Sequence, residues 1–328
     1  MDTNRRALYN SLRMNWILDP GLEVESWQVE DYRAMPLDAL FERLEDMEIH
    51  LDKSSFAAFA ENVDTPEELT NALLDDVTLD TRQQDQIYLL IFELWRRLLP
   101  ERSCLTILCD EIDYQIHLYD QEEASNGEAI ADTLANLQVV LDDNVDEGGE
   151  PHEVFEAINY GCANDLESFL YDYIADRIDE ANYTYATELL EGFSHYIQDT
   201  RWFEFLRARL LSVSDPEEAD ILIKELLSDT QEDQDLEFNL EVLAFLVAVG
   251  DRETFEGLAK KTAKLVKVEE DFQSLLSITA DFYHRLDREH IETSLQTLLK
   301  ERTKRDPHQP FDNRDPHFSS FLKILATP

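Results

Sequence analysis

The chain has 328 residues, of which 72 are acidic and 28 are basic, so its formal net charge is −44. This charge repels nucleic-acid phosphates and anionic membranes, and we expect neither as a partner. Apolar residues make up 43% of the chain, enough for a hydrophobic core, whereas only 8 residues are glycine. Because tight turns are scarce and apolar residues do not alternate with polar ones, the sequence predicts an all-α fold.

The composition also predicts the compartment. No run of about 18 apolar residues is present, and the N-terminus lacks the apolar stretch and cleavage site of a signal peptide. The three cysteines, Cys104, Cys109 and Cys162, are an odd number without a C-x-x-C pair, which argues against a disulfide framework or a zinc knuckle. We therefore expect an intracellular, cytoplasmic protein.

Helix signals divide the first 74 residues into short segments. Apolar residues at helical spacing mark them, and Thr65-Pro66-Glu67-Glu68 has the pattern of a capping box with proline at the first helical position. Residues 22–35 are expected to be irregular, with Trp27 and Tyr32 as anchors. The expected helices cover residues 3–18, 36–47, 56–60 and 65–74.

The stretch from Asp85 to Asp120 contains the strongest helix signal. Its first half repeats apolar residues at the i, i+3, i+4, i+7 spacing, and Leu89 and Phe92 widen this stripe. Neighbours are therefore expected to enclose the helix on most sides. Pro100 ends it, and a second helix follows after a short connection. We predict that the two helices form an antiparallel hairpin.

A further helix is expected after Asn126-Gly127, with Ile130, Leu134, Leu137 and Leu141 on its buried face. The segment Asp142–Glu150 that follows holds two adjacent glycines, five acidic residues and one apolar side chain. This composition is typical of a linker. The sequence therefore predicts an acidic helical domain over residues 1–148 and a second domain that begins at residue 149.

Helix starts become regular in the second half. They are expected near Asn182, Arg201, Pro216, Asp235, Arg252, Glu269 and Asp287. Every second start lies about 34 to 36 residues after the last, the period of tetratricopeptide helix pairs. Gly192 lies 24 residues before Pro216, as glycine and proline do in that family's pattern. Residues 149–302 thus resemble a degenerate tetratricopeptide-like αα-repeat array, which implies a stacked scaffold that binds proteins or peptides on a concave face.

The remaining residues, 303–328, are expected to form a C-terminal tail. They contain the tetrapeptide RDPH twice, at Arg305–His308 and Arg314–His317, and an apolar end follows. Asp-Pro pairs favour turns over helix. Two interpretations remain open: a tail that packs over the last helix, or a motif that docks on a partner or a neighbouring copy.

The charge is unevenly distributed. Ser103–Asp176 contains 19 aspartates and glutamates and no lysine or arginine. Such a segment would steer a basic partner toward the protein. The alternatives are that the acidity only maintains solubility, or that it reflects a high-salt habitat.

One polar pattern is a candidate metal site. In the helix after Pro100, Asp110, Asp113, His117 and Asp120 fall at i, i+3, i+7 and i+10, and Asp113 and His117 lie one turn apart, as two ligands of a divalent metal would. The alternative is a solvated acidic face with an Asp–His pair. A second pattern, Asp281-x-x-His284 with Asp287-x-x-His290, drifts around its helix, so its ligands do not converge.

Other candidate groups favour structural roles. The cysteines lack the cationic neighbours of a reactive thiolate, and we expect them to be buried. Arg96 and Arg97 are expected to oppose the helix dipole and pair with acidic neighbours, or else to bind a partner's carboxylate. Of the cationic cluster Lys260, Lys261, Lys264 and Lys267, the first, third and fourth are predicted to share a helix face, either solvated or in contact with the acidic body of another copy.

No phosphate-binding loop, dinucleotide fingerprint, H-E-x-x-H or G-x-S-x-G motif is present. We therefore expect no enzyme, no catalytic or metal-binding residue and no cofactor. The predicted role is a non-catalytic interaction scaffold, adaptor or chaperone-like binder of a basic partner, with self-association possible. Two alternatives remain: a metal-dependent enzyme that uses the stripe over residues 104–120, and an acidic inhibitor that imitates nucleic acid.

Overall fold

The computed structural model describes residues 4–75, 79–121, 127–229 and 235–326. These residues form 17 α-helices, two short 3-10 helices and no strand, so the all-α prediction is confirmed. Packing contacts divide the chain into two compact units, residues 1–172 with 195–198, and residues 173–194 with 199–328. This division falls at 172–173, whereas the sequence predicts a boundary at 148–149.

Unit 1 is built around helix α5 (Thr81–Leu98), which is buried without interruption from Ile87 to Trp95. The helices α2 (Leu37–Asp46) and α4 (Pro66–Leu74) and the 3-10 turn η2 (Tyr32–Ala34) pack against it. A helix surrounded by neighbours can be apolar on all faces, so the predicted enclosure of this segment is confirmed. Helices α1 (Asn4–Leu18) and α3 (Lys53–Ala60) and the turn η1 (Ser26–Gln28) complete this part of the unit.

The helix starts in unit 1 follow the capping signals of the sequence. The Thr65 hydroxyl accepts the N–H of Glu68 at 3.2 Å, and Pro66 is the first residue of α4. The Glu68 carboxylate accepts the N–H of Asp64 instead of that of Thr65, so only half of the predicted capping box forms. Each such cap satisfies an N–H group that the first helical turn leaves without an acceptor.

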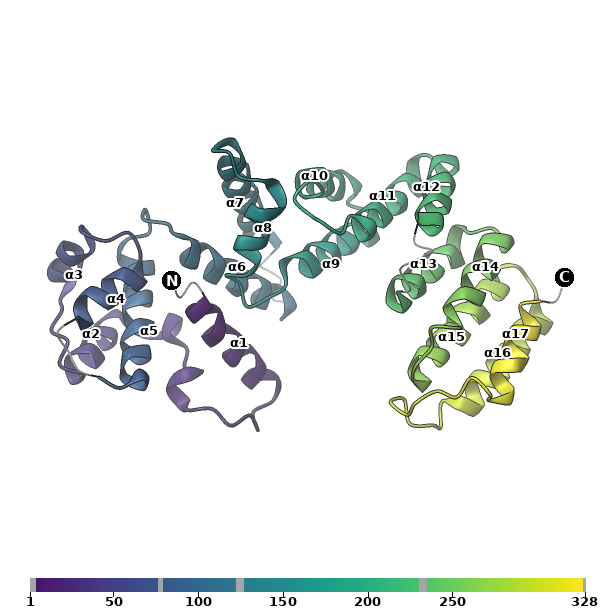
Figure 1. Cartoon of the computed structure of the whole chain (residues 1–328), viewed down its shortest axis with the longest axis horizontal. Helices are drawn as coiled ribbons and strands as arrows, with labels where there is room; N and C mark the ends of the chain where they lie inside the picture. Colours follow the sequence, from purple (N-terminus) through teal and green to yellow (C-terminus); the bar gives the residue numbers. More distant parts are fainter. Residues whose placement is uncertain (1–3, 76–78, 122–126, 230–234, 327–328) are drawn as a thin grey trace. The chain divides into compact units, whose positions relative to one another are not determined.

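The predicted hairpin of α5 with α6 (Leu105–Asp120) is wrong. Helix α6 packs against α1, α7 (Gly127–Asp146) and α8 (Pro151–Asn159), whereas α5 packs against α2 and α4 (Figure 1). The connection explains this difference. The Arg102 guanidinium donates to the carbonyl oxygens of Ala60 and Val63, and the Trp95 indole N–H donates to the Arg102 carbonyl. The chain is thus held beside α3 before α6 begins.

The predicted linker Asp142–Glu150 is largely helical. Helix α7 continues to Asp146, and its predicted apolar face is buried. Only Glu147–Glu150 separates α7 from α8, and Gly148 adopts a positive φ of 107° there. Glycine adopts this conformation readily, as expected after a helix C-terminus. Glu147–Glu150 therefore forms the turn of a helical hairpin. The sequence indicates a linker here because glycines and acidic residues are typical both of linkers and of helix ends.

Helix α9 (Leu166–Asp179) leads into unit 2, where helices pair in sequence. The pairs are α11 (Arg201–Ser214) with α12 (Pro216–Asp229), α13 (Leu236–Val249) with α14 (Arg252–Thr262), and α15 (Glu269–Arg285) with α16 (Glu289–Arg302). Together with α10 (Tyr183–Phe193), these helices begin within two residues of the predicted starts. The predicted helix pattern of this half is confirmed.

The first helices of successive pairs contact each other, α11 with α13 and α13 with α15. Their starts at Arg201, Leu236 and Glu269 lie 35 and 33 residues apart. Aromatic rings fill these contacts. Phe205 of α11 meets Phe238 and Phe245 of α13 edge-on, at ring-centroid distances of 5.9 and 5.6 Å. Aromatic pairs in this geometry stabilise a contact beyond the apolar area that they bury.

The C-terminal segment packs over the last helices, as one of the two interpretations predicts. It pairs with the start of α15 through a β-bridge between Val268 and Pro310, and helix α17 (Pro316–Ile324) packs against α16. Beneath it Arg302, 1% exposed, donates to Glu269, which is also 1% exposed. Asp315 forms ion pairs with Arg302 and Arg305 at 2.9 and 2.7 Å. The first RDPH sequence and the Asp-Pro of the second thus supply part of a buried ion-pair network.

Replacing Glu269 by alanine is expected to destabilise the protein by about 3 kcal/mol, because the buried Arg302 would lose its bidentate partner. The loss should appear as a lower midpoint of urea unfolding. The control is Glu253→Ala, because this exposed carboxylate of α14 forms no ion pair within the described residues. Equal midpoints for the two variants would contradict this account of the network.

Candidate functional site

The predicted metal stripe on α6 begins with Asp110, which is 2% exposed and lies between two arginines. Its carboxylate accepts from Arg6 of α1 at 2.6 Å and from Arg33 at 2.5 Å. Burial raises the pKa of Asp110, but the charges and hydrogen bonds of the two guanidinium groups outweigh this effect and lower the pKa to about 2. The carboxylate is therefore ionised and neutralised within the protein.

The second member of the stripe, Asp113, is also 2% exposed, and its carboxylate is surrounded by hydrogen-bond donors. It accepts the backbone N–H groups of Ala163 and Asn164 and the side-chain amides of Asn10 and Asn164, at 2.9 to 3.0 Å. Burial raises the pKa of Asp113 more than these hydrogen bonds lower it. The side chain thus joins α1, α6 and the turn before α9.

The remaining members of the stripe do not complete a metal site. A hollow of about 40 Å³ lies beside Asp113 and His117, but Arg6, Arg13 and Arg33 also line it, and their charges oppose a cation. Asp120 is exposed at the end of α6. Within the described residues, no three histidine, cysteine, aspartate or glutamate side chains gather as metal ligands would. The alternative of a solvated acidic face is also wrong for Asp110 and Asp113, which are buried.

The second Asp/His pattern is exposed. His284 pairs with Glu292 across a turn at 3.1 Å, and this carboxylate raises the pKa of His284. His290 lies at the exposed start of α16. These contacts are those of a helix-end ion pair.

The cysteines follow their predicted role in part. Cys109 and Cys162 are buried, whereas Cys104 is half-buried at the start of α6. Hydrogen bonding with the Cys109 thiol and burial raise the pKa of Cys162, and burial raises that of Cys104. Raised pKa values keep thiols protonated and poorly nucleophilic.

The predicted cationic groups have different outcomes. Arg96 and Arg97 both pair with the buried carboxylate of Glu93, as expected for a helix end. The lysine cluster does not share a helix face, because α14 ends at Thr262 before Lys264.

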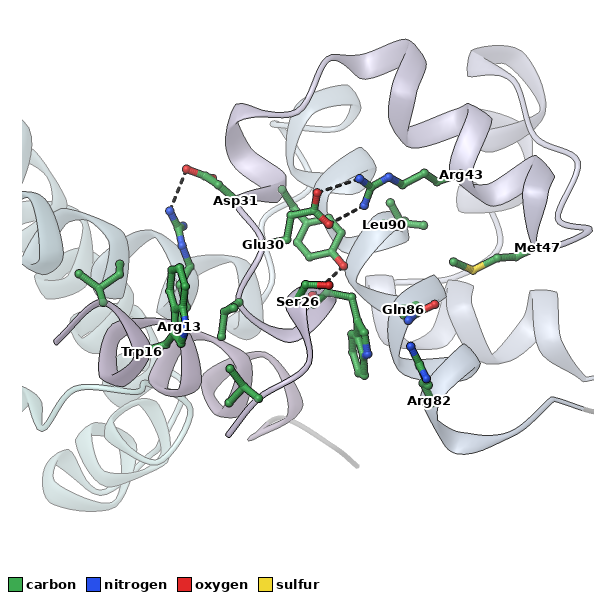
Figure 2. Close-up of a pocket in the computed structure, with 15 residues that line it drawn as sticks. Arg13, Trp16, Ser26, Glu30, Asp31, Arg43, Met47, Arg82, Gln86 and Leu90 are labelled. Carbon is green, nitrogen blue, oxygen red and sulfur yellow. Dashed lines mark hydrogen bonds and ion pairs between the residues drawn. The ribbon is translucent and has the colours of Figure 1, made fainter. Parts of the chain in front are cut away.

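Unit 1 also carries a groove that the sequence pattern does not indicate. It has a volume of about 910 Å³ and lies between the C-terminal half of α1, residues 24–32, and helices α2 and α5. Apolar lining side chains include Trp16, Ile17, Val24, Trp27, Met47 and Leu90. Figure 2 shows Arg13 and Trp16 on one side and Arg43, Met47 and Arg82 on the other.

The charged side chains of this groove form pairs. Arg43 donates to both oxygens of Glu30 at 2.6 and 2.7 Å, and Arg13 donates to Asp31 at 2.8 Å (Figure 2). Arg82 lies 2.7 Å from Glu25. The groove thus joins three guanidinium groups with an apolar floor, an arrangement suited to an extended peptide.

Helices α7 and α8 and the turn between them carry nine exposed carboxylates. They belong to Glu128, Asp132, Asp142, Asp143, Asp146, Glu147, Glu150, Glu153 and Glu156. None forms an ion pair with another described residue. Glu128, Asp132, Asp143 and Asp146 lie on the same exposed face of α7 as Val139, which is 56% exposed. We refer to these nine side chains as the acidic surface.

Sequence analysis missed the partners of the buried carboxylates. Arg6, Arg33 and Asn10 lie 77 to 104 residues from the aspartates that they bind. No local pattern links residues at such separations. A sequence signal existed only for Arg305 and Asp315, which belong to the repeated RDPH sequences.

Comparison with protein-family models, with curated proteins and with solved structures finds no match. In the parts of the chain that the structure describes, no helix combines the length and the apolar character needed to cross a membrane.

The Asp110 site predicts a specific pH dependence. Because its pKa is lowered to about 2 from an ordinary value of 3.8, the charged carboxylate stabilises the fold above pH 3.8, and this contribution is lost as the pH falls toward 2. Asp110→Asn should cost about 2–3 kcal/mol at neutral pH. The difference in the free energy of unfolding between wild type and variant should shrink below pH 4. Urea unfolding at a series of pH values measures it.

The control for this measurement is Asp38→Asn, which changes an exposed aspartate of α2 without an ion pair among the described residues. The free energy of unfolding of this control should differ little from that of the wild type at every pH. A difference for Asp110→Asn that is independent of pH would show that lost packing, not lost charge, causes the destabilisation.

Proposed function

We propose that this chain is a non-catalytic interaction scaffold that binds a basic protein segment on the acidic surface of α7 and α8. The observation that carries the proposal is that all nine carboxylates are exposed and none is neutralised by another described residue. Uncompensated negative charge accelerates encounter with a basic partner and provides acceptors for lysine and arginine.

The end of α7 supports a role beyond solubility. Asp142, Asp143 and Asp146 lie in its last turns, where no basic residue is present. Negative charge at a helix C-terminus opposes the helix dipole, and Asp142 and Asp146 repel each other one turn apart. Acidic residues placed elsewhere would maintain solubility without this cost.

The repeated hairpins of unit 2 support the scaffold role. Starts that lie 35 and 33 residues apart, with contacts between the first helices of successive pairs, fit a tetratricopeptide-like array. We infer that this unit supplies a second surface for protein contacts, as stacked helix pairs commonly do.

The binding test uses a labelled lysine-rich decapeptide and three neutralising substitutions, Asp143→Asn, Asp146→Asn and Glu153→Gln. We expect the affinity of the variant to fall by about tenfold, because three charge contacts of roughly 0.5 kcal/mol each are lost. Wild-type affinity should also fall with added salt, which screens exposed charges beyond roughly 10 Å at 0.1 M.

The matched control changes Glu42, Glu45 and Asp46 of α2 to their amides. These exposed carboxylates belong to the same unit, and their loss changes the net charge equally. If both triple variants weaken peptide binding to the same extent, the attraction is a property of the net charge and the acidic surface has no specific role.

The cost of the acidic helix end gives a second prediction. The double variant Asp143→Asn with Asp146→Asn should raise the melting temperature by about 1–3 °C, because unfavourable charge–dipole interactions are removed. Thermal unfolding followed by circular dichroism measures this shift. A lower melting temperature would show that these carboxylates stabilise the fold, which would remove the support drawn from the helix end.

A further inference from the structure

The groove of unit 1 has polar groups that its own residues leave without partners. The indole N–H of Trp27 is buried and has no acceptor within the described residues, and the Trp27 side chain is 9% exposed. Leaving a buried N–H without an acceptor costs roughly 1–3 kcal/mol. This nitrogen is enclosed in the free protein, so a ligand in the groove reaches it only if neighbouring side chains move.

The two carboxylates that line the groove are already paired. Both oxygens of Glu30 accept from Arg43, and the oxygens of Asp31 accept from Arg13 and from the N–H of Ala34. Glu25, which pairs with Arg82, is not among the residues that line the groove. A basic ligand would therefore have to break existing pairs before it could bind a carboxylate here.

The donors of the groove retain capacity. Arg13 and Arg82 each use a single nitrogen in their pairs, so their other N–H groups have no acceptor among the described residues. The Gln86 amide, which Figure 2 shows close to Arg82, also forms no hydrogen bond there. The guanidinium fork matches the geometry of a carboxylate.

Exposed apolar surface adjoins these donors. Trp16 and Ile17 line the groove and are 37% and 38% exposed, and Leu18, the last residue of α1, is 82% exposed. A cluster of exposed apolar side chains beside polar groups is typical of a peptide-binding surface.

We propose that this groove binds a partner peptide in which two carboxylates flank apolar side chains, with Arg13 and Arg82 each binding one carboxylate and Trp16 and Ile17 binding the apolar side chains. This surface is independent of the acidic surface of α7 and α8 and has the opposite preference for charge. The net charge of the chain disfavours an acidic ligand at long range, but salt screens that field beyond about 10 Å. Contacts inside the groove then determine the affinity.

The test measures fluorescence anisotropy of a labelled decapeptide with an Asp-Leu-Phe-Asp centre against the full-length chain. Three related probes carry asparagine or lysine in place of both aspartates, or serine in place of leucine and phenylalanine. We expect the aspartate probe to bind at least about fivefold more tightly than each of the others. The asparagine and lysine probes lose the charge-assisted hydrogen bonds, and the serine probe loses the apolar burial. A lysine probe that binds as tightly or more tightly would assign the groove to a basic segment and overturn the proposal, as would binding of none of the probes.

Variants of the protein complete the test. The double variant Arg13→Ala with Arg82→Ala should weaken the aspartate probe about tenfold and leave the asparagine probe unchanged. Trp16→Ser should weaken both. Arg207→Ala is the control, because this exposed arginine of unit 2 pairs with Glu204 in a comparable way. All of these side chains are partly exposed, so the variants are expected to fold, which thermal unfolding verifies. Unchanged binding of the aspartate probe to the double arginine variant would also overturn the proposal.

Discussion

Among the described residues, three of the four buried carboxylates, Glu93, Asp110 and Glu269, are neutralised by arginines, and the arrangement of the helices depends on these pairs. Asp110 joins α6 to α1 through Arg6 and to the 3-10 turn η2 through Arg33, and Glu269 joins α15 to the end of α16 through Arg302. An ion buried without a partner costs several kcal/mol. Each pair therefore fixes which helices can be neighbours, in addition to contributing contacts.

The scarcity of cations gives this constraint a functional consequence. With 28 basic residues against 72 acidic ones, pairing at buried positions leaves other carboxylates without a partner. The acidic surface of α7 and α8 lies within the segment that has no lysine or arginine. The groove beside α1 shows the reverse situation, since three arginines but only two carboxylates, Glu30 and Asp31, line it. The two surfaces that we propose as binding sites thus differ in charge, although both belong to one acidic unit.

Local sequence signals predicted where helices begin more reliably than they predicted which helices pack against each other. The starts of α10 to α16 followed from periodicity, proline and capping residues, because those signals act within one or two turns. The hairpin of α5 with α6 was predicted wrongly because a short connection usually reverses direction, whereas here Arg102 binds the carbonyl groups of Ala60 and Val63. The segment Asp142–Glu150 was interpreted as a linker because of its glycines and acidic residues. Acidic residues are also compatible with helical structure, and the helix continues to Asp146.

The sequence by itself determined the helical class, most helix limits, the uneven charge and the scarcity of cations, since each is a property of composition or of residues a few positions apart. Only the tertiary structure decided that Asp110 and Asp113 are buried structural groups, that Arg13 and Arg82 line one groove, and that the carboxylates of α7 and α8 form no ion pair with any residue that the structure describes. The physical reason is distance along the chain. Burial and ion pairing depend on contacts between segments up to about a hundred residues apart, as between Arg6 and Asp110, and no local pattern encodes such contacts.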